Sequence, residues 1–198
     1  RTFWLSETPD VPSVGWDDEL ERIVSMVTLK HKQYTVNFFN THFDHVGVVG
    51  RNQLAVLIAD RMEHYNKFPS FLTGDFNSEP SSAPYQYLKE HGIKDSRTLT
   101  RDAWKYGYNA TYTLFDEIHE ADSIIDYIWA PAYATAVGTS KKLPSITVHS
   151  YGVLHSHFGF YMSDHRPVTA LYSIKLWYMF NIEKKRKLVT ITIDVYIW

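Results

Sequence analysis

Four short polar motifs, each lying within or directly after an apolar run that reads as a β-strand, constrain this chain most. The motifs are Asn40–His45, Gly74–Asn77, Ile125–Ile128 and Ser163–Pro167. Each places a carboxylate, an imidazole or an amide where a strand leaves its sheet. Strand ends are rigid mounts, and functional side chains tend to gather there. The spacing therefore predicts a fold in which distant strand ends present one polar site.

Strand-like and helix-like segments alternate along the chain, which indicates an α/β or mixed architecture. Leu54, Ile58 and Met62 fall on one face of a helix that starts near residue 51. A second helix is predicted over 82–91, closed by Gly92 as a left-handed cap. The β-rich segments predicted to be strands are 23–29, 34–41, 71–74, 111–115, 124–130, 145–149, 167–174 and 189–197.

Composition excludes several classes of protein. Of the 198 residues, 44% are hydrophobic and 16% aromatic, which supports a packed core and excludes general disorder. The net charge of −2 provides no basic field to collect nucleic acid by charge alone. Cys is absent, which excludes disulfides, thiolate zinc sites and Cys nucleophiles. No uncharged apolar run reaches the roughly 18 residues of a membrane span.

The chemistry of the motif residues points to hard or borderline metal ions. Carboxylates with His and Asn suit Mg²⁺ or Mn²⁺ at a phosphate better than a thiolate-bound metal. Asp126 lies inside an apolar strand, where a carboxylate is costly unless paired, and His165 is its natural partner. A plainer interpretation stays open for the others: Asp75 with Asn77 can form a turn, and Asp164 can cap a strand.

In this order, the four motifs resemble those of the endonuclease/exonuclease/phosphatase superfamily, which has the deoxyribonuclease-I-like fold. Phe3–Pro9, Gly15–Asp17, and Arg51 with Gln53 resemble one branch of it, and the resemblance runs from about residue 2 to about residue 172. It implies an α/β fold of two packed, mainly antiparallel sheets flanked by helices, a four-layer sandwich.

The resemblance also implies roles for the catalytic residues. His165 would be the catalytic His that works on the phosphate, and Asp126 would accept a hydrogen bond from its other ring nitrogen. His42 would donate to a non-bridging oxygen as charge grows in the transition state. Asp75 would orient or deprotonate the attacking water, and Asn77 would hold that water or a phosphate oxygen.

Asp164 resembles the metal ligand that precedes the catalytic His, and Asp75 is the second expected ligand of Mg²⁺ or Mn²⁺. The family's early Asn and its metal-binding Glu have no counterpart in a recognisable context, and Glu7 lies in the wrong motif. The domain, 1–175, is thus expected to be N-terminally incomplete, with a divergent tail over 176–198. Residues 177–182 loosely resemble the missing opening strand, with Asn181 in place of its Asn.

We therefore expect a divalent-metal-dependent phosphoesterase that cleaves a phosphodiester or phosphomonoester, including nucleases such as a 3′–5′ RNA exonuclease. Its partner would be a nucleic acid, a nucleotide or a small phosphoester, and the protein a soluble monomer, cytoplasmic or secreted. The alternative is a catalytically impaired remnant that acts only as a binding module. A third interpretation is a zinc hydrolase of the metallo-β-lactamase type, because His42–His45 resembles half of that motif, with Asn40 at its first His.

Overall fold

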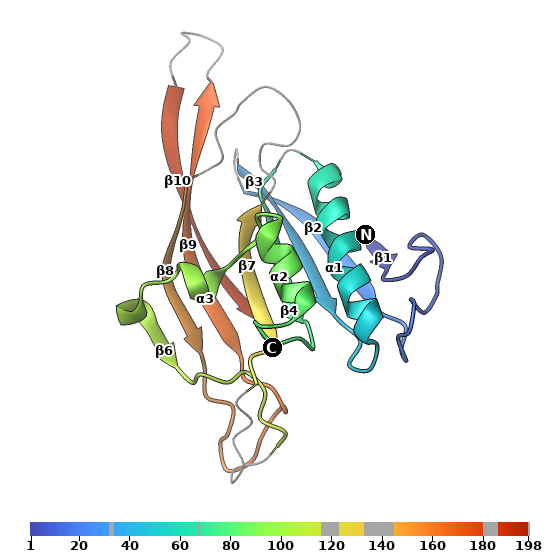
Figure 1. Cartoon of the computed structure of the whole chain (residues 1–198). Coiled ribbons are helices and arrows are strands. Elements are labelled where there is room, and N and C mark those ends of the chain that lie inside the picture. The colour runs from blue at the N-terminus through green and yellow to red at the C-terminus, as the bar shows by residue number, and fades with distance from the viewer. Residues whose placement is uncertain (32–33, 67, 116–122, 133–144, 180–185, 198) are drawn as a thin grey trace.

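The computed structural model describes residues 1–198 except 32–33, 67, 116–122, 133–144, 180–185 and 198. The described residues form two β-sheets, and two longer helices pack beside the first (Figure 1). The strands are β1 (Thr2–Trp4), β2 (Ile23–His31), β3 (Tyr34–His42), β4 (Ser70–Asp75), β5 (Lys94–Asp95), β6 (Lys105–Gly107), β7 (Asp126–Ala132), β8 (Ser145–Val153), β9 (Val168–Met179) and β10 (Arg186–Ile197). The helices are α1 (Val48–Tyr65), α2 (Ala83–Glu90) and α3 (Ser96–Leu99), followed by a 3-10 turn, Asp102–Trp104.

The first sheet has the strand order β1-β2-β3-β4-β7-β5, and α1 and α2 pack on one of its faces. Leu54, Ile58 and Met62 of α1 are fully buried there, together with Phe39 and Trp129 of the sheet. The helical period in the sequence therefore predicted the buried face of α1 correctly. The second predicted helix is confirmed as α2, and Gly92 has the expected left-handed φ of 82°.

The second sheet has the order β10-β9-β8-β6 and packs against the other face of the first sheet. Phe71 and Ile128 of the first sheet meet Val168, Tyr172 and Ile174 of the second in a buried cluster. All strand pairs are antiparallel except β3–β4 and β6–β8. The predicted sandwich of two mainly antiparallel sheets is confirmed. Both of its longer helices, α1 and α2, pack on the outer face of the first sheet.

The register of three strands brings the polar motifs to one end of the first sheet. β4 runs parallel to β3 and antiparallel to β7, so Asp75 lies opposite His42 on one side and Asp126 on the other. Gly74 allows the close approach: its φ is +140°, and a Cβ there would overlap the carbonyl oxygen of Thr41. A glycine is therefore required directly before Asp75.

One predicted strand is wrong. Within 111–115 only Tyr112 forms an isolated bridge, to His165, and Leu114 and Phe115 have left-handed φ values of 58° and 57°. The segment is instead bound to the chain before β9, because the Thr113 N–H and hydroxyl both donate to the carbonyl of Asp164. β-propensity over a Thr- and Tyr-rich segment was overridden by these tertiary hydrogen bonds.

The tail joins the second sheet. The strand predicted over 189–197 is confirmed as part of β10, which pairs antiparallel with β9 from Val168 to Met179. The expected domain boundary at residue 175 therefore falls inside β9, and the division into a domain and a divergent tail stays a prediction. The resemblance proposed for Asn181 concerns a residue outside the described part of the chain.

Candidate active site

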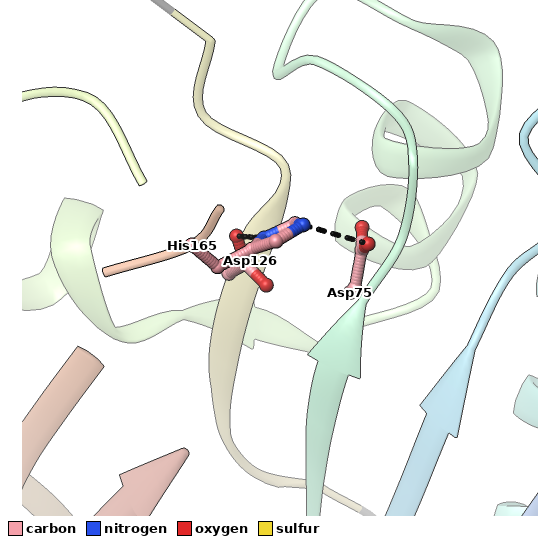
Figure 2. A group of neighbouring side chains, drawn as sticks. All are labelled: Asp75, Asp126 and His165. Carbon is pink, nitrogen blue, oxygen red and sulfur yellow. Dashed lines mark hydrogen bonds and ion pairs between the residues drawn. The ribbon is translucent and has the colours of Figure 1, made fainter. Parts of the chain in front are cut away.

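Three of the predicted residues meet at the end of the first sheet. Asp75 ends β4, Asp126 begins β7 and His165 lies just before β9. Figure 2 shows the His165 imidazole between the two carboxylates. Its Nδ1 lies 2.8 Å from Asp126 Oδ2, and its Nε2 lies 3.7 Å from Asp75 Oδ2. The pairing of Asp126 with His165 predicted from the apolar surroundings of Asp126 is present in the structure.

Thr111 holds this arrangement together, although the sequence pattern did not single it out for the site. Its buried hydroxyl accepts from the N–H of Ile125 at 3.0 Å and of Asp126 at 3.2 Å. Its carbonyl accepts from the N–H of Arg166 at 2.7 Å. One residue thus ties the start of β7 to the segment that carries His165. A hydroxyl that binds two distant backbone groups leaves no periodic signal in a sequence, which is why it was missed.

Tyr112 places an aromatic ring beside the catalytic candidate His165. The two ring centroids are 5.1 Å apart at an angle of 56°, and the two residues form a backbone bridge. The ring of Tyr112 therefore packs against the imidazole that Asp126 holds through Nδ1.

His42 and Asn77 also adjoin Asp75. His42 Nε2 lies 3.2 Å from Asp75 Oδ2, and the Asn77 N–H donates to Asp75 Oδ1 at 2.8 Å. The side-chain amide of Asn77 donates to the carbonyl of Phe43 at 2.9 Å, and its φ is 44°. Asn77 therefore closes a turn and joins the ends of β3 and β4, while its predicted contact with water or phosphate stays a prediction.

Burial and neighbouring charges set the protonation of the site. Burial, reinforced by the Asp126 carboxylate, raises the pKa of Asp75 to about 6. Burial opposes a charge on His165, but the hydrogen bond and the charge of Asp126 outweigh it and raise the pKa of His165. Burial and the positive charge of Arg22 lower the pKa of His42. Near neutral pH the site thus combines a carboxylate that exchanges a proton readily, an imidazole that favours its charged form, and a neutral imidazole.

Asp75, Asp126 and His165 could also hold a metal ion, because one ligand atom of each lies within 4.8 Å of the others. Asp164, the other ligand predicted from the sequence, is not part of this group; its Oδ1 lies 3.5 Å from the hydroxyl of Ser163. The sequence predicted Asp164 and Asp75 as ligands, and of these two Asp75 belongs to the group that the structure brings together. Whether Asp164 binds the ion stays a prediction.

Two further motif residues, Asp44 and His45, lie away from this cluster. Asp44 is fully buried and accepts from the N–H groups of Leu20, Val46 and Gly47 at 2.8–3.1 Å. His45 lies 3.5 Å from the carboxylate of the exposed Glu19. Neither joins the cluster at Asp75, so the geometry does not assemble the ligands that a metallo-β-lactamase-type zinc site would need.

The family model described as the Endonuclease/Exonuclease/phosphatase family matches residues 11–165. The chain belongs to this family. The match covers all four polar motifs up to His165, and the metallo-β-lactamase interpretation is therefore wrong. This match confirms the predicted superfamily, and the two packed sheets confirm the predicted fold. The family typically hydrolyses phosphoesters and uses divalent metals.

Three solved structures of this kind are similar to the chain. An endonuclease/exonuclease/phosphatase family protein from Bacteroides thetaiotaomicron is 34% identical, with a TM-score of 0.74 over 88% of this chain and 63% of that one. A family protein from Bacteroides vulgatus is 30% identical, with a TM-score of 0.75 over 88% and 64%. A mannosyl-6-phosphatase from Bacteroides thetaiotaomicron VPI-5482 is 35% identical, with a TM-score of 0.71 over 85% and 63%.

The chain spans less than two thirds of the length of these three family structures. Among the described residues, none of the helices has the length and apolar character needed to cross a bilayer.

Proposed function

We propose that this chain carries the catalytic residues of a divalent-metal-dependent phosphoesterase that acts first of all on phosphomonoesters. The observation that carries the proposal is the imidazole of His165, held by Asp126 through Nδ1 and turned with Nε2 toward Asp75. The monoester preference is supported by the similarity to a mannosyl-6-phosphatase at 35% identity. The net charge of −2 also disfavours a long nucleic-acid footprint.

Each residue has a task that its environment suits. Asp75, with a pKa raised to about 6, would take the proton of the attacking water near neutral pH. His165, kept toward its charged form by Asp126, would donate from Nε2 to a phosphate oxygen. His42, half-exposed and adjacent to Asp75, would donate to a second oxygen as negative charge accumulates. Asn77 would keep the ends of β3 and β4 in register through its bond to Phe43.

The donor chemistry of the site fits a divalent cation. The carboxylates of Asp75 and Asp126 each offer an oxygen atom within 4.8 Å of the other and of a His165 ring nitrogen. Oxygen-rich donor sets of this kind suit Mg²⁺ or Mn²⁺. Asp75 would hold the ion, together with Asp164 or Asp126. When bound, the ion would offset charge on the phosphate and on the leaving oxygen.

Hydrolysis by the purified chain tests the proposal. Aryl phosphate and aryl phosphodiester would be supplied with Mg²⁺ or Mn²⁺, with and without chelator, for the wild type and for His165→Gln. His64→Gln is the matched control, because His64 is an exposed residue of α1 whose side chain is 72% exposed. We expect chelator-sensitive turnover that falls at least about 10²-fold in His165→Gln alone.

The opposite result would identify a different function. A folded chain that hydrolyses neither ester at any metal concentration would support the non-catalytic binding module instead. Turnover that survives in His165→Gln would show that the cluster at Asp75 is not the reacting centre. Faster hydrolysis of the diester than of the monoester would replace the phosphatase proposal by a phosphodiesterase, with the same residues.

A further inference from the structure

Two loops beside His165 carry an unusual group of exposed apolar side chains. Leu114 and Phe115 are 57% and 59% exposed on the loop after Thr113. Phe158, Phe160 and Met162 are 64%, 65% and 49% exposed on the loop between β8 and β9. Figure 1 shows both loops at the lower end of the molecule. We define these five residues as the apolar rim.

The rim is attached directly to the candidate active site. The N–H and hydroxyl of Thr113 donate to the carbonyl of Asp164 at 2.6 Å and 2.9 Å, so the two loops are joined one residue from His165. Leu114 follows this joint, and Met162 precedes it by two residues. Tyr112, whose ring lies against the imidazole, extends the apolar surface to His165 itself. A leaving group that departs from a phosphate at His165 would thus meet the rim.

The backbone of both loops adopts conformations that are unfavourable or tightly constrained, and these conformations leave the rim side chains exposed. Leu114 and Phe115 are consecutive residues with left-handed φ, which bulky side chains rarely adopt and which costs energy at each residue. Phe158 and Phe160 flank Gly159, at φ +84°, in a tight turn closed by the Phe158 N–H bond to the Phe160 carbonyl at 3.1 Å. The bridge between His157 and Tyr161 braces this turn.

The lack of Lys and Arg in the two loops argues against an anionic ligand at the rim. Residues 106–115 and 154–165 contain no Lys or Arg, and Asp164 is their one acidic residue. A surface for anionic lipid or for a nucleic-acid backbone would carry cations. Exposed aromatic rings without neighbouring cations suit a flat, weakly polar ring of the ligand. Stacking between the two ring faces is favourable whichever substituents the edge of the ligand ring carries.

Resting on the proposed function, we infer that the apolar rim is a subsite for the leaving alcohol of the substrate, and that this alcohol carries a ring that stacks on Phe115, Phe158 or Phe160. The ring could be a nucleobase or the apolar face of a sugar, because both present a flat surface of suitable size. Specificity would then come from the rim, and the phosphate chemistry from the cluster at Asp75.

Phosphate release from three substrate types tests this inference. A nucleoside monophosphate and a hexose 6-phosphate carry rings of the two kinds, and ethyl phosphate carries none. Phe115→Ala and the double variant Phe158→Ala/Phe160→Ala would be compared with wild type on each substrate. Trp104→Ala is the control, because Trp104 is an aromatic residue 41% exposed beside β6, stacked with Arg101 rather than placed at the rim.

We expect kcat/KM for the preferred ring-bearing substrate to fall by about 10-fold or more in the rim variants, mostly through KM, while ethyl phosphate changes less than about 2-fold. Comparing variants on the same substrate removes the effect of leaving-group basicity. The ring-bearing substrate that loses more identifies the ring as base or sugar. Equal losses on all three substrates, or no loss on any, would overturn the subsite.

Two further measurements separate this inference from the proposed function. Binding of the free nucleoside and of methyl hexoside, followed by saturation-transfer NMR, needs no turnover; binding that the double variant loses supports the rim even if hydrolysis fails. Flotation with zwitterionic phosphatidylcholine vesicles tests the competing class of occupant. Vesicle binding that the double variant abolishes, with ring preference unchanged, would make the rim a bilayer contact and refute the subsite.

Discussion

Asp44 is a fully buried carboxylate and Asp75 a largely buried one, near the ends of two adjacent parallel strands, but their surroundings give them opposite properties. Asp44 accepts from three backbone N–H groups, which outweigh its burial and lower its pKa to about 2. Asp75 accepts from one, that of Asn77, and faces Asp126, so burial raises its pKa to about 6. The number of fixed backbone donors decides whether a carboxylate holds structure or remains available for proton transfer.

The structural role of Asp44 extends to its neighbours. α1 begins after Gly47, which has no side chain to cap it. Asp17 instead accepts from the N–H groups of Val48, Val49 and Gly50, and Asp44 accepts from Gly47 itself. A segment 31 to 33 residues upstream thus caps the helix. We refer to Asp17 and Asp44 as the helix clamp.

The largest expected effect concerns the carboxylate of the candidate active site. Asp75→Asn keeps the shape of the side chain but removes the group that accepts the proton of water, so kcat should fall about 10³-fold. The free energy of unfolding at neutral pH should not fall, because a buried carboxylate facing Asp126 is replaced by a neutral amide. Single-turnover kinetics and urea unfolding would measure the two quantities. Activity within 10-fold of wild type would remove Asp75 from the proton transfer.

The converse is expected at the helix clamp. Asp44→Ala leaves the N–H groups of Val46, Gly47 and Leu20 without this acceptor, that of Gly47 in a buried position, which should lower the free energy of unfolding by about 3 kcal/mol. The variant that remains folded should keep kcat within a few-fold of wild type, because Asp44 does not contact Asp75 or His165. If activity were lost while stability stayed unchanged, the division between the two carboxylates would be wrong.

The sequence predicted the candidate active site better than the clamp, and the reason is physical. Asp75, Asp126 and His165 stand at the ends of apolar strands, a pattern visible without a structure. Within the helix clamp, Asp17 binds backbone N–H groups 31 to 33 residues along the chain, and a backbone N–H has no residue type to recognise. Asp44 was accordingly predicted only as a member of the polar motif Asn40–His45 and of the zinc interpretation of His42–His45.

The fold shows the same division. Two sheets and α1 could be predicted because each buries a periodic apolar face, as Leu54 and Ile58 do. The segment 111–115 could not be predicted, because its conformation follows from the bonds of Thr111 and Thr113 to residues far along the chain. Where tertiary hydrogen bonds determine the backbone conformation against its local propensity, the sequence pattern predicts the wrong secondary structure.

Acid unfolding provides a third way to test the contrast. The folded pKa of Asp44 is depressed from 3.8 to about 2, so its contribution to stability is present above pH 4 and is lost as the pH falls toward 2. This contribution amounts to about 2 kcal/mol. The difference in unfolding free energy between wild type and Asp44→Asn should therefore shrink over that interval, as urea unfolding at successive pH values would show. A constant difference from pH 5 to pH 2 would exclude a depressed pKa.

The smallest expected effect has the opposite sign and concerns Asp18, which lies beside the helix clamp. Both carboxylate oxygens of Asp18 are buried without a hydrogen-bond partner, against Gly47 and Gly50, and burial with the nearby charges of Asp44 and Asp17 raises its pKa to about 6. Because the folded state binds this proton more tightly, stability is greatest below pH 4 and falls as the pH rises through 6. Asp18→Asn should remove that fall and stabilise the protein at pH 7.5 by about 1 kcal/mol, with Arg51 and Arg22 limiting the gain.

Thermal unfolding of Asp18→Asn and wild type at pH 4.5 and pH 7.5 would measure this effect, with Asp10→Asn as an exposed control whose carboxylate is 82% exposed. Similar melting temperatures at pH 4.5 that separate at pH 7.5 would show that the ionised Asp18 carboxylate destabilises the folded protein. A variant that is less stable at both pH values would mean that the Asp18 carboxylate holds α1 as Asp17 and Asp44 do, because the three would then act together as ionised caps.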